Sequence, residues 1–99
     1  MKYEIGSEAS ATVLALREQL TFADRPALDG LIPSLMTARK SITVDLAGLE
    51  YMDSSGLGML LTLRDAAQKN GLTVSLRAPK GDVKELLALS CFDTLFQIT

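Results

Sequence analysis

The sequence predicts an α/β domain with a mixed β-sheet, an N-terminal hairpin and helices packed on the sheet. The pattern of expected strands and helices favours this class. Short alternating or β-branched runs, which are typical of strands, alternate through the second half of the chain with segments whose apolar residues recur at helical spacing. Such alternation is typical of parallel strands joined by helices. The chain has 99 residues, enough for one hydrophobic core, so we expect one domain over residues 1–99.

The first part of the chain predicts a hairpin followed by a helix. Strands are expected near 2–5 and 11–17, with a turn over 6–10 between them. After a loop over 19–23, Asp24 is expected to cap a helix that has Pro26 in its first turn, where a missing N–H costs least. Pro33 lies inside this helix, so we expect a kink or a break there. The core stripe of the helix consists of Leu28, Leu31, Ile32, Leu35 and Met36.

The second half predicts three further strands and two helices. We expect strands over 41–46, 72–76 and 95–98, and a helix over 82–89. A longer helix is expected from Ser55 to about Asn70, closed by Gly71 as a left-handed C-cap. The single cysteine, Cys91, cannot form an internal disulfide, and its apolar neighbours lead us to expect a packing residue without function.

The residue types that are absent exclude several kinds of chemistry. The chain has no histidine, which excludes a histidine-dependent catalytic triad and a histidine metal site. Asp45, Glu50 and Asp53 are close in sequence and leave a carboxylate cluster for a cation as a minor alternative. The segment 53–56 lacks the lysine of a phosphate-binding loop. We therefore expect no enzyme activity, no cofactor and no metal.

Charge and hydropathy indicate where the protein acts. The net charge is −2 and the charges of both signs are interspersed, so no basic stripe is available for direct binding to nucleic acid. No apolar run approaches the roughly 18 to 20 residues of a membrane span, and the N-terminus lacks a signal-peptide pattern. We expect a cytoplasmic protein that does not insert into a membrane.

The turn over residues 53–56 carries two hydroxyls where a helix is expected to begin. Asp53 or Ser54 is a natural N-cap, and an added phosphate is favourable at the positive end of a helix dipole. The turn is therefore a candidate phosphorylation switch. The plain alternative is a strand-to-helix connection with an ordinary cap.

Two leucines lie outside the apolar arc of the helix that follows. At 100° per residue, Leu57 and Leu61 share a flank with polar residues. They fit either a protein contact or a wider core, and both interpretations stay open. The arc itself contains Met59, Leu60, Leu63, Ala66 and Ala67.

The motif over residues 51–58, preceded by Val44-Asp45-Leu46, resembles that of the bacterial anti-sigma factor antagonists of the STAS domain type. The order of the remaining elements agrees over nearly the whole chain. The resemblance implies a switch protein in which Ser54 is phosphorylated by an ATP-using anti-sigma factor kinase and dephosphorylated by a PP2C-type phosphatase. It further implies that the unphosphorylated form binds the anti-sigma factor, which then releases its sigma factor or another regulated partner.

The resemblance also indicates the partner-binding residues. Asp53 flanks the switch, Ser55 is a neighbouring hydroxyl, Gly56 allows close approach, and Leu57 with Leu61 shapes the contact surface. Many antagonists carry Gly-Glu-Leu-Asp in the loop that contributes to the kinase contact, whereas this chain has Glu18-Gln19-Leu20-Thr21, so Thr21 is a further candidate. Longer members of the family add a helix after the last strand, whereas the last expected strand here is followed only by Thr99.

Two other functions remain compatible with a STAS domain. One is a subunit that binds the ATPase or permease of a membrane transport assembly and needs no serine phosphorylation. The other is a nucleotide-binding STAS domain. A serine that directly follows Asp53 favours the antagonist over the transport subunit.

Overall fold

The computed structural model describes residues 1–99 and is built on a five-stranded sheet in the order β1-β2-β3-β4-β5. The strands are β1 (Lys2–Ser7), β2 (Ala11–Leu20), β3 (Ser41–Met52), β4 (Val74–Arg77) and β5 (Gln97–Ile98). β1 and β2 pair antiparallel as a hairpin, and every later pair is parallel. The predicted α/β class and N-terminal hairpin are confirmed.

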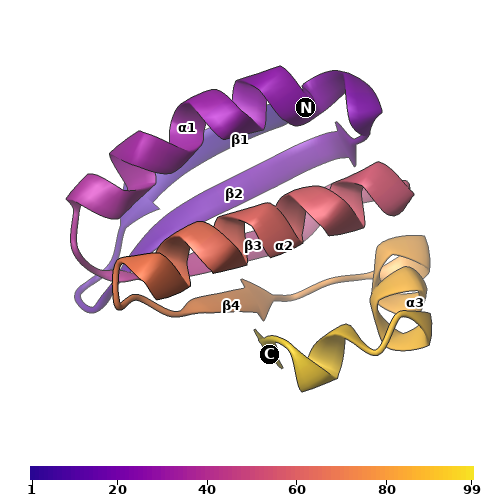
Figure 1. The fold of residues 1–99 in the computed structure, drawn as a ribbon. Coiled ribbons are helices and arrows are strands. Elements are labelled where there is room, and N and C mark those ends of the chain that lie inside the picture. The colour runs from indigo at the N-terminus through magenta and orange to yellow at the C-terminus, as the bar shows by residue number, and fades with distance from the viewer.

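Three helices and two 3₁₀ turns connect the strands. The helices are α1 (Arg25–Thr37), α2 (Ser54–Lys69) and α3 (Gly81–Leu89), and the 3₁₀ turns are η1 (Phe22–Asp24) and η2 (Phe92–Thr94). α1 and α2 lie side by side on one face of the sheet, whereas the opposite face carries no helix (Figure 1). Both helices start at the same end of the molecule, where β2 and β3 also end (Figure 1). None of the helices combines the length and the apolar character needed to pass through a membrane.

The hydrophobic core lies between the sheet and these helices. Alternate strand residues point to the helices because successive side chains of a strand face opposite sides. Each fully buried leucine contributes about 1.5–3 kcal/mol relative to an exposed one. The buried strand residues include Leu14, Leu16, Ile42, Val44, Leu46, Val74 and Leu76.

The helix-free face of the sheet is covered by polar pairs. The hydroxyls of Thr43 and Ser75 are 3.4 Å apart on neighbouring strands. The guanidinium of Arg77 contacts Asp45 at 3.2 Å and Glu8 at 3.0 Å. Asp45 is thereby paired with a cation of the chain itself.

α1 runs without interruption through Pro33, which excludes the break predicted there as one of two outcomes, and the kink stays a prediction. Its core stripe is confirmed, since Leu28, Leu35 and Met36 are buried while Leu31 and Ile32 are half-buried against the core. Pro33 is exposed, and buried residues on both sides of it hold the two halves of the helix on the sheet. Packing thus outweighs the loss of one backbone hydrogen bond.

The C-terminus of α2 confirms the predicted cap. Gly71 has a φ of +71°, which glycine adopts at little cost. Its N–H donates to Gln68 O at 3.1 Å, and the N–H of Leu72 donates to Ala67 O at 2.8 Å. These two bonds satisfy carbonyls that the helix end leaves without partners.

β3 extends six residues beyond its predicted end at Leu46 and stops at Met52. The pairing of β2 with β3 shifts register between Ala15 and Arg17 and again between Glu18 and Gln19. Such irregularities break the two-residue alternation, and Leu46, Leu49 and Met52 are buried at intervals of three. The extension carries the chain directly to the predicted switch motif.

The C-terminal segment differs from the prediction in two ways. Cys91 is exposed, not packed, and has a φ of +57° at the start of η2. The core is filled instead by Phe92 and Phe96, whose rings stack with centroids 5.5 Å apart. η2 occupies the segment just before the last strand, which is limited to Gln97–Ile98.

Candidate functional site

The candidate site lies where β3 ends and α2 begins. Leu20 and Met52, the last residues of β2 and β3, are register partners and both buried. The N–H of Asp53 donates to the carbonyl of Leu20 at 3.3 Å. The loops that follow the two strands therefore start side by side.

The carboxylate of Asp53 holds these two loops together. Its Oδ1 accepts a hydrogen bond from the N–H of Gly56 at 2.9 Å, which makes Asp53 the N-cap of α2. Its Oδ2 accepts one from the N–H of Phe22 at 3.3 Å. Of the two caps that the sequence allows, the structure uses Asp53, and α2 begins one residue earlier than predicted, at Ser54.

The two serines of the motif differ in accessibility. Ser54 is exposed in the first turn of α2, and its hydroxyl makes no hydrogen bond within the chain. Ser55 is half-buried. Ser54 therefore presents the more accessible of the two hydroxyls.

Gly56 lets α2 approach the sheet closely. The residue is buried, and an added Cβ would overlap Met52 Cγ and come within 2.8 Å of the carbonyl oxygen of Leu20. The absence of a side chain at Gly56 therefore lets the start of α2 lie close to the sheet. Any side chain at this position would push the start of α2, and with it Ser54, away from the sheet.

Thr21 and Asp24 form a second polar cluster in the loop after β2. The N–H and the hydroxyl of Thr21 donate to Asp24 Oδ2 at 2.8 and 3.3 Å. The amino group of Met1 donates to Asp24 Oδ1 at 2.6 Å. Burial alone raises the pKa of Asp24, but the hydrogen bonds from Met1 and Thr21 outweigh it, so the pKa lies below the ordinary 3.8. Thr21 thus stabilises the loop on which Phe22 stands.

Phe22 is an exposed aromatic residue that the sequence interpretation did not assign. Its side chain is 76% exposed, although its backbone is fixed to Asp53. The signal in the sequence is a phenylalanine two residues before the predicted helix cap Asp24, in the loop that follows the second strand. Exposed aromatic side chains on a fixed backbone are frequent anchors of protein interfaces.

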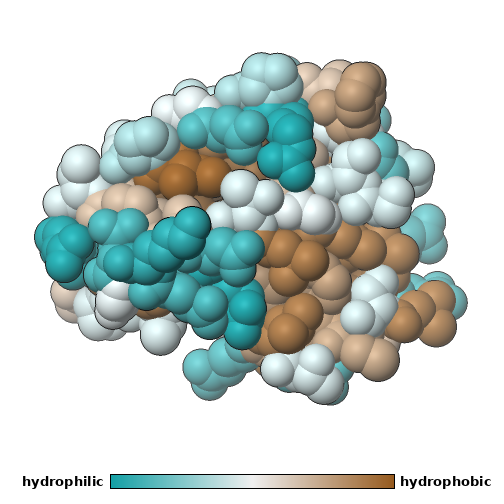
Figure 2. Space-filling model, in the orientation of Figure 1, coloured by the Kyte–Doolittle hydropathy of each residue, from teal (hydrophilic) through white to brown (hydrophobic).

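Leu57 and Leu61 lie at the border between core and surface. Both are half-buried against the core, which agrees with the wider core, and their role in a protein contact stays a prediction. Figure 2 shows an apolar area over the first half of α2 and the adjoining α3. Leu61 lies nearly two turns along α2 from Ser54, whereas Leu57 is in the first turn.

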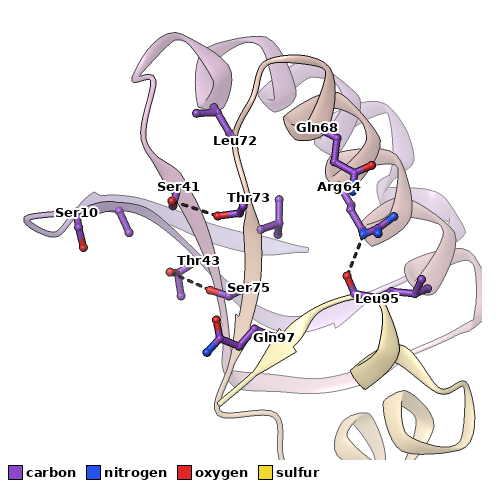
Figure 3. A pocket seen from close by; sticks show the side chains of 12 residues that line it. Ser10, Ser41, Thr43, Arg64, Gln68, Leu72, Thr73, Ser75, Leu95 and Gln97 are labelled. Carbon is purple, nitrogen blue, oxygen red and sulfur yellow. Dashed lines mark hydrogen bonds between the residues drawn. The ribbon is translucent and has the colours of Figure 1, made fainter.

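The molecule has two hollows of nearly equal volume, and one of them lies away from this site. It measures about 500 Å³ and opens near the amino ends of β3 and β4, opposite to the end where β3 meets α2. Its side chains bond to their own neighbours (Figure 3): Thr73 to Ser41 at 3.2 Å, and Arg64 Nε to the carbonyl of Leu95 at 2.9 Å. No group of three acidic, cysteine or histidine residues lies close enough to hold a metal ion.

Comparison with known proteins identifies a family and a shared fold. A family model described as "Mlab, STAS domain" matches residues 4–97. A STAS-domain containing protein of Pseudomonas aeruginosa is 44% identical over 64 residues, which cover 65% of this chain and 62% of that protein. The matched segment thus spans less than two thirds of the length of this relative.

Three solved structures, of two proteins, are similar over nearly the whole chain. An anti-sigma factor antagonist from Mycobacterium paratuberculosis has a TM-score of 0.85 at 17% identity, covering 98% of this chain and 83% of that one. SpoIIAA of Bacillus in its unphosphorylated form has a TM-score of 0.74 at 19% identity, covering 99% and 88%. Its phosphorylated form gives 0.73 at 16% identity, covering 99% and 91%. At these identities the likeness shows a common fold.

Proposed function

This chain belongs to the STAS domain family, and from that premise we propose that it is an anti-sigma factor antagonist whose binding is controlled by phosphorylation of Ser54. In this proposal the unmodified protein acts in the cytoplasm, where it binds an anti-sigma factor and frees a sigma factor or another regulated partner. The anti-sigma factor is also a serine kinase. It transfers the γ-phosphoryl group of ATP to Ser54 Oγ, releasing ADP and the hydroxyl proton, and a PP2C-type phosphatase later hydrolyses the phosphoserine. The antagonist itself catalyses nothing.

The observation that carries this proposal is the state of the Ser54 side chain. Its hydroxyl is exposed and bonded to nothing in the chain, while Asp53 on its N-terminal side takes over the capping of α2. Modification of Ser54 therefore breaks no internal hydrogen bond. The fold would remain intact while the surface changes, as a switch requires.

The change at the surface is mainly electrostatic. A phosphate on Ser54 adds about 1.5 to 2 negative charges directly beside the carboxylate of Asp53. The same surface carries the exposed ring of Phe22 and the half-buried Leu57. A partner that covers these apolar groups would have to desolvate the new charge, and a loss of about 1.4 kcal/mol already weakens binding tenfold.

The proposal is tested by comparing two variants as bait in extracts of the native host. Ser54→Ala, which imitates the unmodified form, should retain a protein with an ATP-binding serine kinase domain, and Ser54→Asp should lose it. Ser10→Ala serves as the control, because it removes an exposed hydroxyl at the hollow that lies away from this site. Equal melting temperatures of the three variants would exclude unfolding as the cause.

The same experiment contains the result that contradicts the proposal. If Ser54→Ala and Ser54→Asp retain the same partner to the same extent, the charge at Ser54 does not control binding. Retention of a transport ATPase or a permease by both variants would assign the chain to a transport assembly, the other function compatible with a STAS domain.

A further inference from the structure

Arg25 places a guanidinium group on the side of α2 where Ser54 lies. The Nη2 atom of Arg25 is 3.8 Å from the position that a Cβ on Gly58 would occupy. Because Gly58 has no side chain, the arginine rests directly over the helix backbone at this point. Arg25 is the first residue of α1, and the first turns of α1 and α2 lie at the same end of the molecule (Figure 1).

Ser54 and Gly58 are separated by one helical turn on the same face of α2. Residues at this spacing have Cβ positions about 5–6 Å apart. A phosphate on Ser54 Oγ extends outward from the serine, and the flexible arginine side chain can swing toward it from its place above Gly58. The distance between the two groups is therefore short enough for a direct ion pair.

The present partner of Arg25 is weak. Its Nη1 atom lies 3.5 Å from Asp29 Oδ1, and the two side chains are 44% and 48% exposed. Exposed pairs of this kind contribute little to stability. A phosphate dianion carries more charge than the carboxylate of Asp29 and offers three acceptor oxygens to the guanidinium fork.

The carboxylates at this end of α2 already have partners within the chain. Asp53 directly precedes the serine, and its carboxylate is occupied by the backbone N–H groups of Gly56 and Phe22. Asp24 is occupied by Met1 and Thr21. Arg25 is thus a cation that the fold brings to this end of α2 with only an exposed carboxylate, that of Asp29, as its partner.

We propose that Arg25 is the intramolecular ligand of a phosphate monoester on Ser54, exchanging Asp29 for the phosphate when the serine is modified. The inference rests on the proposed function for the presence of that phosphate. In the modified form the arginine leaves the surface next to Phe22 and closes over the first turn of α2. The modified surface then differs from the unmodified one in the position of a cation as well as in its added negative charge.

The test uses the full chain with phosphoserine introduced at residue 54 during translation, so that no kinase is needed. Phosphorus NMR then follows the second ionisation of the phosphate in the otherwise unchanged protein, in Arg25→Gln and in Arg39→Gln. The last variant is the matched control, because it removes the same charge just beyond the opposite end of α1. Melting temperatures establish that each protein is folded.

A guanidinium bound to the phosphate favours the dianion and lowers its second pKa, so Arg25→Gln should raise that pKa by about half a unit or more. Arg39→Gln should leave it unchanged. Equal pKa values in all three folded proteins would overturn the inference. That outcome would leave the proposed function intact, since the latter fails only if Ser54 is not modified in cells or if its modification does not alter binding.

Discussion

The carboxylate of Asp53 accepts a hydrogen bond from the backbone N–H of Phe22, a residue 31 positions earlier in the chain, at 3.3 Å. The same carboxylate caps α2 through Gly56. Asp53 therefore fixes the helix that begins with Ser54 and the loop that presents an exposed aromatic ring. Asp53 therefore holds in place both Ser54, the proposed switch, and Phe22, the proposed contact residue.

Asp53→Ala should lower the free energy of unfolding by about 0.5–2 kcal/mol, because the N-cap of α2 and the bond to Phe22 are lost together. Urea unfolding followed by circular dichroism measures this difference. Asp53→Asn keeps one acceptor oxygen and should therefore show only part of this loss of stability. An unchanged urea midpoint for Asp53→Ala would show that the cap seen in the structure does not stabilise the helix.

Phe22→Ala should weaken binding to the anti-sigma factor at least about tenfold, which corresponds to about 1.4 kcal/mol, without altering thermal stability. Leu89→Ala is the control, since its side chain is also 76% exposed but lies on α3. Isothermal titration calorimetry with the purified partner provides the affinities. Equal losses for both variants would argue against a specific role of Phe22.

Two glycines in the first turns of α2 should respond to alanine in opposite directions. Gly56→Ala introduces a Cβ that overlaps Met52 and approaches Leu20, and overpacking of this kind costs about 1–3 kcal/mol. At Gly58 the nearest atom to a new Cβ is Arg25 Nη2 at 3.8 Å, an ordinary contact. Gly58→Ala should therefore gain up to about 1 kcal/mol from helix propensity. Urea unfolding of both variants measures these changes in the free energy of unfolding. If Gly58→Ala also destabilises the protein, the ordinary contact described at Gly58 is wrong.

Asp24 makes the stability of the protein depend on pH at the acidic end. Its pKa is lowered in the folded state from the ordinary 3.8, so the folded state binds this proton less readily than the unfolded state. The stabilisation from Asp24 is present above pH 3.8 and should be lost as the pH falls through the lowered folded value.

Unfolding of the wild-type protein and Asp24→Asn at a series of pH values measures this contribution. The difference between the two proteins should be largest near neutral pH and shrink in acid. Acetylation of the Met1 amino group should reduce the difference, because it removes the cation that bonds to Asp24 at 2.6 Å. A difference that does not vary with pH would contradict the assignment.

The sequence was a good guide where local rules decide the structure. The cap at Gly71 follows from glycine chemistry, and the stripe on α1 follows from helical spacing, so both were predictable. The extension of β3 to Met52 was not, because irregular pairing with β2 breaks the alternation on which strand prediction depends. Cys91 was expected to be buried because its neighbours are apolar, yet Phe92 and Phe96 occupy the core in its place.

For the candidate site, the motif supplied the serine and its neighbours, but not their environment. That Asp53, and not Ser54, caps α2 depends on which side chain reaches Gly56, and the sequence allowed both. The bond from Phe22 to Asp53 and the position of Arg25 over Gly58 join segments that are far apart in the chain. Only the packing of η1 and α1 against α2 brings them together.

The central claim is that Ser54 is a regulatory phosphorylation site, and its most direct test is the mass of the protein isolated from its own cells, with and without phosphatase treatment. The account predicts a fraction heavier by about 80 Da, the addition expected for a phosphate, which phosphatase removes and peptide mapping assigns to Ser54. A protein without this addition under every growth condition, or with its phosphate on another residue, would contradict the claim.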